Sequence, residues 1–136
     1  MGMEADLLAR LGAVTGLDPL GGRIAWMERP RKSSPEFPAL VLTIVSPGRD
    51  WTHDGPDNLD RPRVQCDFYG ASPAQLRDLF VAFRDEMETM PYVDVGDTRF
   101  HPAMLDTQRD LPAEDLSDGV RIFRINADFQ FYHEPV

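Results

Sequence analysis

The sequence predicts an α+β fold: a mostly antiparallel β-sheet with two main helices packed on one face. Apolar residues at helical spacing over 4–14 and 73–90 predict the two helices. Alternation of apolar and polar residues over 63–69 and 123–131 predicts half-buried strands. The 12 prolines, well above average usage, favour short elements joined by stiff loops. Because the chain has 136 residues, 42% of them hydrophobic, we expect a single domain spanning residues 1–136.

The first 45 residues predict a helix, a turn and two strands, in that order. The helix over 4–14 carries one apolar stripe, and the glycines and proline of residues 16–22 predict a turn after it. Residues 23–27 are a short strand candidate, and the prolines of residues 28–38 predict a loop. Residues 39–45 are apolar on both faces, so we expect a strand covered on both sides. The helical stripe consists of Leu7, Leu8, Leu11 and Val14.

An irregular loop over residues 46–62 is predicted to join two antiparallel strands as a wide hairpin. Loops longer than about 12–15 residues are uncommon in compact domains and are usually functional or mobile. In the strand that follows, Val64, Cys66 and Phe68 point to one side and the intervening polar residues to the other. Since Cys66 lies on the apolar face, we expect it to be a small core residue and not a nucleophile.

The second helix is predicted from its capping residues as well as its spacing. Ser72 supplies an N-cap, Pro73 a favoured first-turn residue and Gln75 a capping-box partner. Pro91 predicts that the helix ends at about Met90. The predicted buried stripe consists of Leu76, Leu79, Phe80, Phe83, Met87 and Met90.

The C-terminal third predicts two short strands, an acidic loop and one long strand. We place the short strands around 98–101 and 104–108, and the acidic loop over 111–119. The long strand over 123–131 alternates strictly, so one face is expected on the core and the other towards water or a neighbouring subunit. Its aromatic residues are expected to pack on Phe80 and Phe83. The predicted core face consists of Phe123, Ile125, Ala127, Phe129 and Phe131, and His133 beyond it is expected to be exposed.

Metal binding by the long loop is the main enzymatic possibility that the residues raise. Its carboxylates and one imidazole are groups that divalent cations accept, namely Asp50, His53, Asp54, Asp57 and Asp60. Their spacing fits no calcium-loop pattern, so we expect a solvated acidic loop. The sequence also contains no glycine loop of the kind that cradles phosphates. We therefore predict no catalytic residue, no metal, no cofactor and no enzymatic activity.

The charge and hydropathy of the chain limit its partners. A net charge of −9 disfavours broad binding to nucleic acid, although a negative wall suits a passage through which DNA slides. The longest apolar run, residues 39–45, is far too short to span a membrane. Acidic residues stand near the N-terminus where a signal peptide needs basic ones, so we expect the chain to stay in the cytoplasm. The single cysteine excludes an intramolecular disulfide.

Two polar segments are candidate interfaces with another subunit or with a partner. Trp51 stands in the long loop beside Arg49, Asp50 and His53. A tryptophan in a polar loop usually covers something, so Trp51 either folds back on its own domain or anchors a partner. The second segment is the basic cluster of Arg29, Arg31 and Lys32. That cluster is either a solvated loop or a contact for phosphates or an acidic partner.

The order of these elements resembles the tail completion, or tail terminator, proteins of long-tailed bacteriophages. The most characteristic piece is the run R-V-Q-x-D-x-Y at residues 63–69, which follows a DGP turn at 54–56 and precedes an amphipathic helix. The strand FPALVLTIVS lies upstream, and an R-D pair at 109–110 lies downstream. A closing strand with Arg121, Arg124 and Asp128 before FQFY completes the pattern. The resemblance covers most of the chain and includes no active site.

The resemblance implies a structural protein of the virion, located at the head-proximal end of the tail and assembled in the host cytoplasm. Such proteins form a ring, typically a hexamer, that ends polymerisation of the tail tube and offers a docking surface for the filled head. The implied partners are further copies of the chain, the tail tube protein and the head–tail connector protein. DNA is expected to pass through the ring without specific binding. A ring needs two different patches on each copy, and the Trp51 loop and the polar face of the last strand are our candidates.

Several alternatives remain open from the sequence. A neighbouring connector or stopper protein of the head–tail junction shares the size, acidity and architecture of a terminator. A different class is a small metal- or ligand-binding domain that uses the loop from Asp50 to Asp60, and a third is a dimeric interaction module. The composition, rich in Ala, Arg, Asp, Gly and Pro, fits a prophage or a gene transfer agent as well as a free phage.

Overall fold

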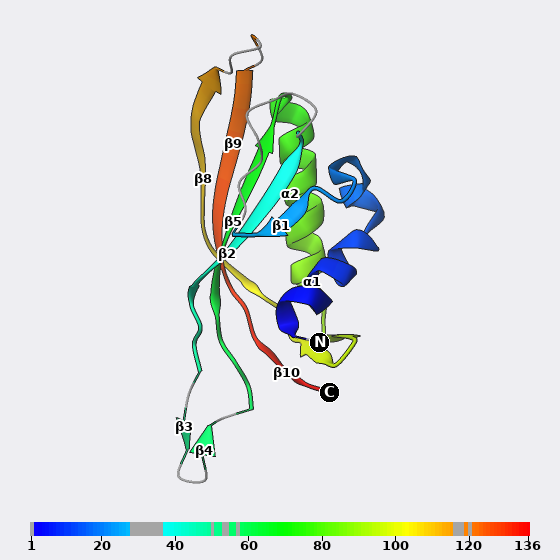
Figure 1. The fold of residues 1–136 in the computed structure, drawn as a ribbon, viewed down its shortest axis with the longest axis vertical. Helices are drawn as coiled ribbons and strands as arrows, with labels where there is room; N and C mark the ends of the chain where they lie inside the picture. The colour runs from blue at the N-terminus through cyan, green and yellow to red at the C-terminus, as the bar shows by residue number, and fades with distance from the viewer. Residues whose placement is uncertain are drawn as a thin grey trace.

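The chain folds as an α+β structure with a mostly antiparallel central sheet (Figure 1). The computed structural model describes residues 2–27, 37–49, 51–52, 55–56, 58–115, 119 and 121–136. The strand order of the central sheet is β1-β2-β5-β9-β8, and every neighbouring pair is antiparallel except β1 and β2. These strands are β1 (Ile24–Trp26), β2 (Ala39–Ser46), β5 (Arg63–Gly70), β8 (Met104–Asp115) and β9 (Arg121–Gln130).

The helices cover one face of this sheet (Figure 1). They are α1 (Met3–Gly12), the 3₁₀ helix η1 (Thr15–Leu20) and α2 (Pro73–Met87). Ser72 caps α2 as predicted, because its hydroxyl accepts a hydrogen bond from the backbone N–H of Gln75 at 3.3 Å. Among the described residues, no helix has the length and apolar character needed to cross a membrane.

The core lies between α2 and the inner face of the sheet, where the alternating strands predicted it. Val64, Cys66 and Phe68 of β5 are completely buried. Phe83 of α2 packs edge-to-face on Phe68 and Phe129, with ring centroids 5.4 Å and 5.3 Å apart. The predicted packing of the last strand on Phe83 is therefore confirmed, whereas Phe80 packs on Phe68, at 5.8 Å, and not on a ring of that strand.

A second sheet and a hairpin complete the fold. The second sheet has the order β10-β7-β6, formed by His133–Pro135, Thr98–Phe100 and Val93–Val95. Its inner residues Thr98 and Phe100 are buried, and the Thr98 hydroxyl donates to buried Asp6 of α1 at 2.6 Å. The hairpin consists of β3 (Trp51–Thr52) and β4 (Gly55–Pro56), which pair only with each other in the described ladders.

The structure corrects several predicted elements. The segment expected as a turn at 16–22 contains η1, and α2 ends at Met87, one turn before the expected Met90. The acidic loop predicted over 111–119 is wrong for its first half, because β8 continues to Asp115. His133 is half-buried in β10 and not exposed, since β10 pairs with β7.

Candidate interaction surface

The long loop forms an arm, defined here as residues 47–62, that projects from the end of the sheet (Figure 1). The β3–β4 hairpin lies at its far end, with Trp51 paired to Pro56. The predicted wide hairpin is confirmed, because β2 and β5 on either side of the arm pair in antiparallel fashion. In the described ladders this hairpin adds no strand to the main sheet, and long loops of this kind are often functional.

The base of the arm is held by backbone hydrogen bonds at two places, called crossings here because two segments of the chain pass each other there. In the first, the N–H of Arg61 donates to the carbonyl of Gly48 at 3.0 Å. Gly48 has φ +60°, and a Cβ there would lie 1.9 Å from the Arg61 carbonyl oxygen. Only glycine therefore permits this crossing. The sequence shows Gly48 as an ordinary loop glycine, and no spacing pattern predicts the close approach.

The second crossing joins the arm to the C-terminal segment. Asp60 and His133 exchange both backbone hydrogen bonds, at 2.8 Å and 3.0 Å. Next to them, the side-chain amide of Gln130 donates to the Arg61 carbonyl at 2.7 Å. These contacts fix where the arm leaves the body. Burial lowers the pKa of His133 and so favours the neutral imidazole, whereas the carboxylates of Asp60 and Glu4 act in the opposite direction.

The predicted interface residues are only partly described. Arg49 is exposed three residues after the end of β2, and Trp51 lies in β3 at the end of the arm. The remaining candidates, Asp50, His53, Arg29, Arg31 and Lys32, lie outside the described residues, as do Asp54 and Asp57 of the loop considered for metal. In the part of the chain that the structure describes, no group of His, Cys, Asp and Glu is arranged to hold a metal ion.

The helix-free face of the sheet carries a polar network that the sequence did not predict. Asp67 of β5, expected on a solvent-facing side, is only 4% exposed. Its carboxylate accepts hydrogen bonds from Arg124 Nη2 at 2.9 Å, Asn126 Nδ2 at 2.7 Å and Gln65 Nε2 at 3.0 Å. The guanidinium of Arg124 also lies over the ring of Tyr69, 5.4 Å from its centroid. Because the donors surround the carboxylate, the charge of Asp67 is buried and compensated.

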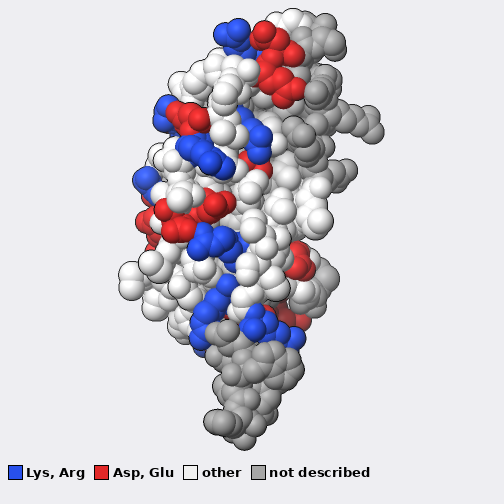
Figure 2. Space-filling view, turned by 90° about the vertical axis from the view of Figure 1, so that its left-hand side faces the viewer, with Lys and Arg blue, Asp and Glu red and all other residues white. Residues whose placement is uncertain are grey.

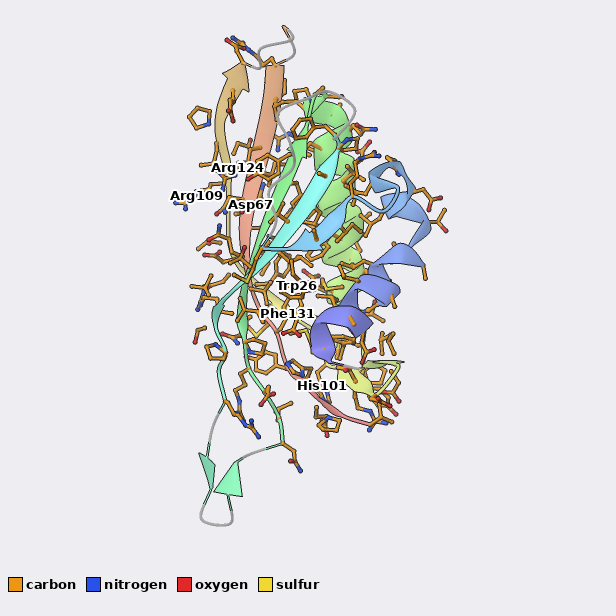
Figure 3. The ribbon with its side chains drawn as sticks, viewed as in Figure 1. Trp26, Asp67, His101, Arg109, Arg124 and Phe131 are labelled. Carbon is orange, nitrogen blue, oxygen red and sulfur yellow. The ribbon has the colours of Figure 1, made fainter. Side chains whose placement is uncertain are left out.

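Arginines form the accessible layer of this face. Arg109 of β8 pairs in register with Asn126 of β9, which points to the same face as Arg124, so Arg109 and Arg124 share this face. Arg63 forms an ion pair with Asp106 nearby. The face also contains Asp128, which accepts a hydrogen bond from Thr107 Oγ1 at 3.3 Å. Its other carboxylate oxygen is buried and has no hydrogen-bond partner among the described residues. Figure 2 shows cationic and anionic residues interleaved over this side of the molecule. In Figure 3, Arg109 points away from the helices and from the labelled Asp67.

The edge strand β8 is accessible along almost its whole length. All its residues except Leu105 and Leu111 are exposed, and those two are half-buried. Two register shifts against β9, at 105–107 and 111–114, interrupt the strand, and Pro112 lies in the second. Bulges, proline and charged side chains are devices that prevent uncontrolled pairing at a sheet edge. The exposed side chains of β8 are therefore better suited to contact a partner than its backbone is.

The outer face of the small sheet presents two rows of side chains. Register places Asp94, Arg99 and Glu134 in one row. The second row is Tyr92, His101 and Tyr132: the ring centroids of Tyr92 and His101 lie 6.3 Å apart, and the backbone N–H of His101 donates to the Tyr132 carbonyl at 2.9 Å. Arg99 donates two hydrogen bonds to Asp94, at 2.8 Å and 3.1 Å, and lies 4.1 Å from the centre of the Tyr92 ring. The hydrogen bond to Arg99 lowers the pKa of Asp94, and His101 Nε2 lies 2.5 Å from Glu134. These charges are satisfied within the sheet.

Cys66 is not part of any accessible site. Burial is the main reason that the pKa of its thiol is raised well above the ordinary value, with smaller contributions from the carboxylates of Asp67 and Asp128. A buried, protonated thiol is a poor nucleophile. The structure therefore agrees with the expectation of a core cysteine.

Comparison with known proteins identifies a similar fold. No family model matches the chain, and no curated protein matches it. Among solved structures, the chain is similar to a chain of the "Virion of native gene transfer agent (GTA) particle", with a TM-score of 0.64 and 14% sequence identity. The likeness covers 97% of this chain and 94% of that chain. At this identity it shows that the two chains share a fold from end to end.

Proposed function

We propose that this protein is a structural component of a phage-like virion, a tail terminator with no enzymatic role. In this proposal, copies of the chain form a ring of six at the head-proximal end of the tail. The ring ends polymerisation of the tail tube and provides the surface on which the head docks. Its partners are other copies of the chain, the tail tube protein and the head–tail connector protein, and DNA passes through the ring without specific binding.

The observation that carries the proposal is the end-to-end likeness in fold to a chain of a gene transfer agent virion. A partial match would be compatible with a common supersecondary unit, but here almost no part of either chain is left over. The resemblance of the sequence to tail terminators rests on the order of motifs along the chain, which is a separate line of support. We also propose that residues 1–136 form the single domain expected from the sequence.

The arm is our first candidate for an assembly contact. Its base is held by Gly48 and by the Asp60–His133 pair, while its hairpin lies away from the main sheet. Trp51 in β3 at the end of the arm, together with its sequence neighbours Arg49, Asp50 and His53, is proposed to contact the tube or a neighbouring copy. The cluster of Arg29, Arg31 and Lys32 is proposed as a further contact of the same kind.

Substitution of Trp51 tests this assignment. Trp51→Ala is expected to leave the free energy of unfolding of the purified chain unchanged within about 0.5 kcal/mol, as for a surface residue. It is expected to reduce the yield of joined particles in a producing strain. A loss of stability of several kcal/mol with normal assembly of the surviving protein would show that Trp51 belongs to the core instead.

Deletion of the gene in a producing strain tests the proposed function as a whole. Negative-stain electron microscopy is expected to show filled heads beside unattached tails of uncontrolled length. Tails of normal length beside heads that have lost their DNA would indicate a connector or stopper in place of a terminator. Intact, infectious particles would contradict a role in the virion.

A further inference from the structure

Two of the described arginines have no polar or charged partner among the residues that the structure describes. Every other described arginine contacts a carboxylate or a carbonyl group, as in the pairs Arg10–Glu86, Arg63–Asp106 and Arg124–Asp67. The exceptions are Arg49 and Arg109, which are both exposed. In a chain with 23 acidic and 14 basic residues, carboxylates are in surplus, so an unpaired arginine is not explained by a shortage of partners.

Arg109 is the better placed of the two for a contact across a ring. It lies in the regular part of β8 between the two register shifts, on the helix-free face of the sheet. Its cross-strand neighbour Asn126 is already bonded to Asp67. Nothing in the described part of the chain therefore holds the guanidinium, and a carboxylate from another molecule can approach it from the open side.

An acidic stripe lies on the opposite side of the molecule, along the solvent face of α2. It consists of Asp78, Asp85 and Glu88, around the exposed side chain of Val81. Asp85 lies near Arg84, at 3.5 Å, whereas Asp78 and Glu88 have no charged partner among the described residues. Glu88 stands at the C-cap of α2, where a negative charge is unfavourable for the helix dipole, so local helix stability does not account for it.

We infer that Arg109 of one copy binds the acidic stripe of α2 in the next copy, an inference that rests on the proposed ring. The two patches have opposite charge. Arg109 lies on the helix-free face of the sheet (Figure 3), whereas α2, which carries the acidic stripe, covers the other face (Figure 1). A contact between two different patches repeats from copy to copy and closes into a ring if the rotation permits. The contact between Arg109 and the acidic stripe also attracts neighbouring copies to each other, whereas the net charge of −9 on each chain otherwise makes the copies repel one another.

Charge reversal in a deletion strain complemented with variant genes tests this contact. Arg109→Glu, and separately Asp78→Lys with Glu88→Lys, are each expected to reduce the yield of joined particles by about tenfold or more, because like charges then face each other. A gene that carries all three changes restores the opposite charges and is expected to recover the yield to within about threefold of wild type. The matched control is Gln108→Glu, because Gln108 is exposed on the same strand but faces the other side of the sheet.

The outcomes separate this inference from the proposed function. If deletion disrupts particles but the combined variant is no better than the single reversals, the contact with the next copy is wrong and Arg109 meets another partner, such as the tube or DNA. Full yield with each reversal alone would also contradict it. If deletion leaves particles intact, the proposed function fails and the contact fails with it. If a charge reversal lowers the melting temperature of the purified chain, the milder variants Arg109→Gln and Asp78→Asn are used in its place. The fall in particle yield of the double variant must then be smaller than the sum of the falls of the two single variants.

Discussion

Phe129 provides the sharpest test of how the core is organised. Its side chain is completely buried in β9, and its ring packs edge-to-face on Phe83, with centroids 5.3 Å apart and planes at 75°. It also contacts Phe131, with centroids 6.3 Å apart. Replacement by alanine removes the ring from the layer between α2 and the sheet and leaves a cavity that the surrounding strands are too rigid to fill.

The expected cost of Phe129→Ala is about 3–5 kcal/mol, the usual range for a buried Phe→Ala change. The lost aromatic pairs, at about 0.5–1.5 kcal/mol each, place the value towards the upper half of that range. For a chain of this length, 4 kcal/mol corresponds to a fall in melting temperature of roughly 12–16 °C. Urea unfolding followed by circular dichroism measures the change, which is expected to lower the midpoint without changing the slope.

Phe123→Ala is the matched control, because Phe123 lies on the same face of the same strand but is only half-buried. Its expected cost is about 1–2 kcal/mol, since less apolar surface is removed from the interior. A near-neutral Phe129→Ala, or one no more costly than Phe123→Ala, would refute the assignment of the two faces of β9 and the packing of α2 on them.

Three further predictions concern polar features of the fold. Asp67→Ala leaves Arg124 without its carboxylate partner and is expected to lower the free energy of unfolding by about 2–4 kcal/mol. Urea unfolding measures this change. If Asp67→Ala lowers the free energy of unfolding no more than Asp67→Asn does, the charge of Asp67 is not important. Gly48→Ala places a Cβ against the Arg61 carbonyl and so disturbs the base of the arm. We expect the core to stay folded and the yield of joined particles to fall. A normal particle yield would show that the base of the arm is dispensable. Burial lowers the pKa of His133 in the folded chain, so the unfolded chain binds the proton more readily. The free energy of unfolding is therefore expected to be steady above about pH 6.5 and to fall as the pH is lowered below it. Urea midpoints measured between about pH 5 and pH 8 check this, and His133→Gln is expected to make the fall smaller.

Much of the fold can be predicted from the periodicity of apolar residues, and the elements that could not be predicted each have a physical reason. Alternation in β5 and β9 identified the core faces, because one side of each strand is buried and the other is polar. The full length of β8 was missed, since both of its faces are largely exposed and its residues show no alternation. The parallel pairing of β1 with β2 was not predicted either, because strand direction depends on the route of the intervening chain.

The candidate surface was only partly predictable. The length of the arm and the presence of Trp51 within it are visible in the sequence. The bracing of its base depends on contacts between residues about 70 positions apart, such as Gln130 with Arg61, which no local pattern reveals. Asp67 shows the same limitation: it occupies a polar position of an alternating strand, and only the strand order brings Arg124 and Asn126 of β9 around it.

The most direct measurement is a cryo-electron microscopy reconstruction of the head–tail junction in particles that contain this protein. The proposed function predicts density for the chain in one ring of six copies between the tail tube and the connector, with the helix-free face of each copy near α2 of the next. Density for the chain along the whole tube, or its absence from the junction, would contradict a terminator role.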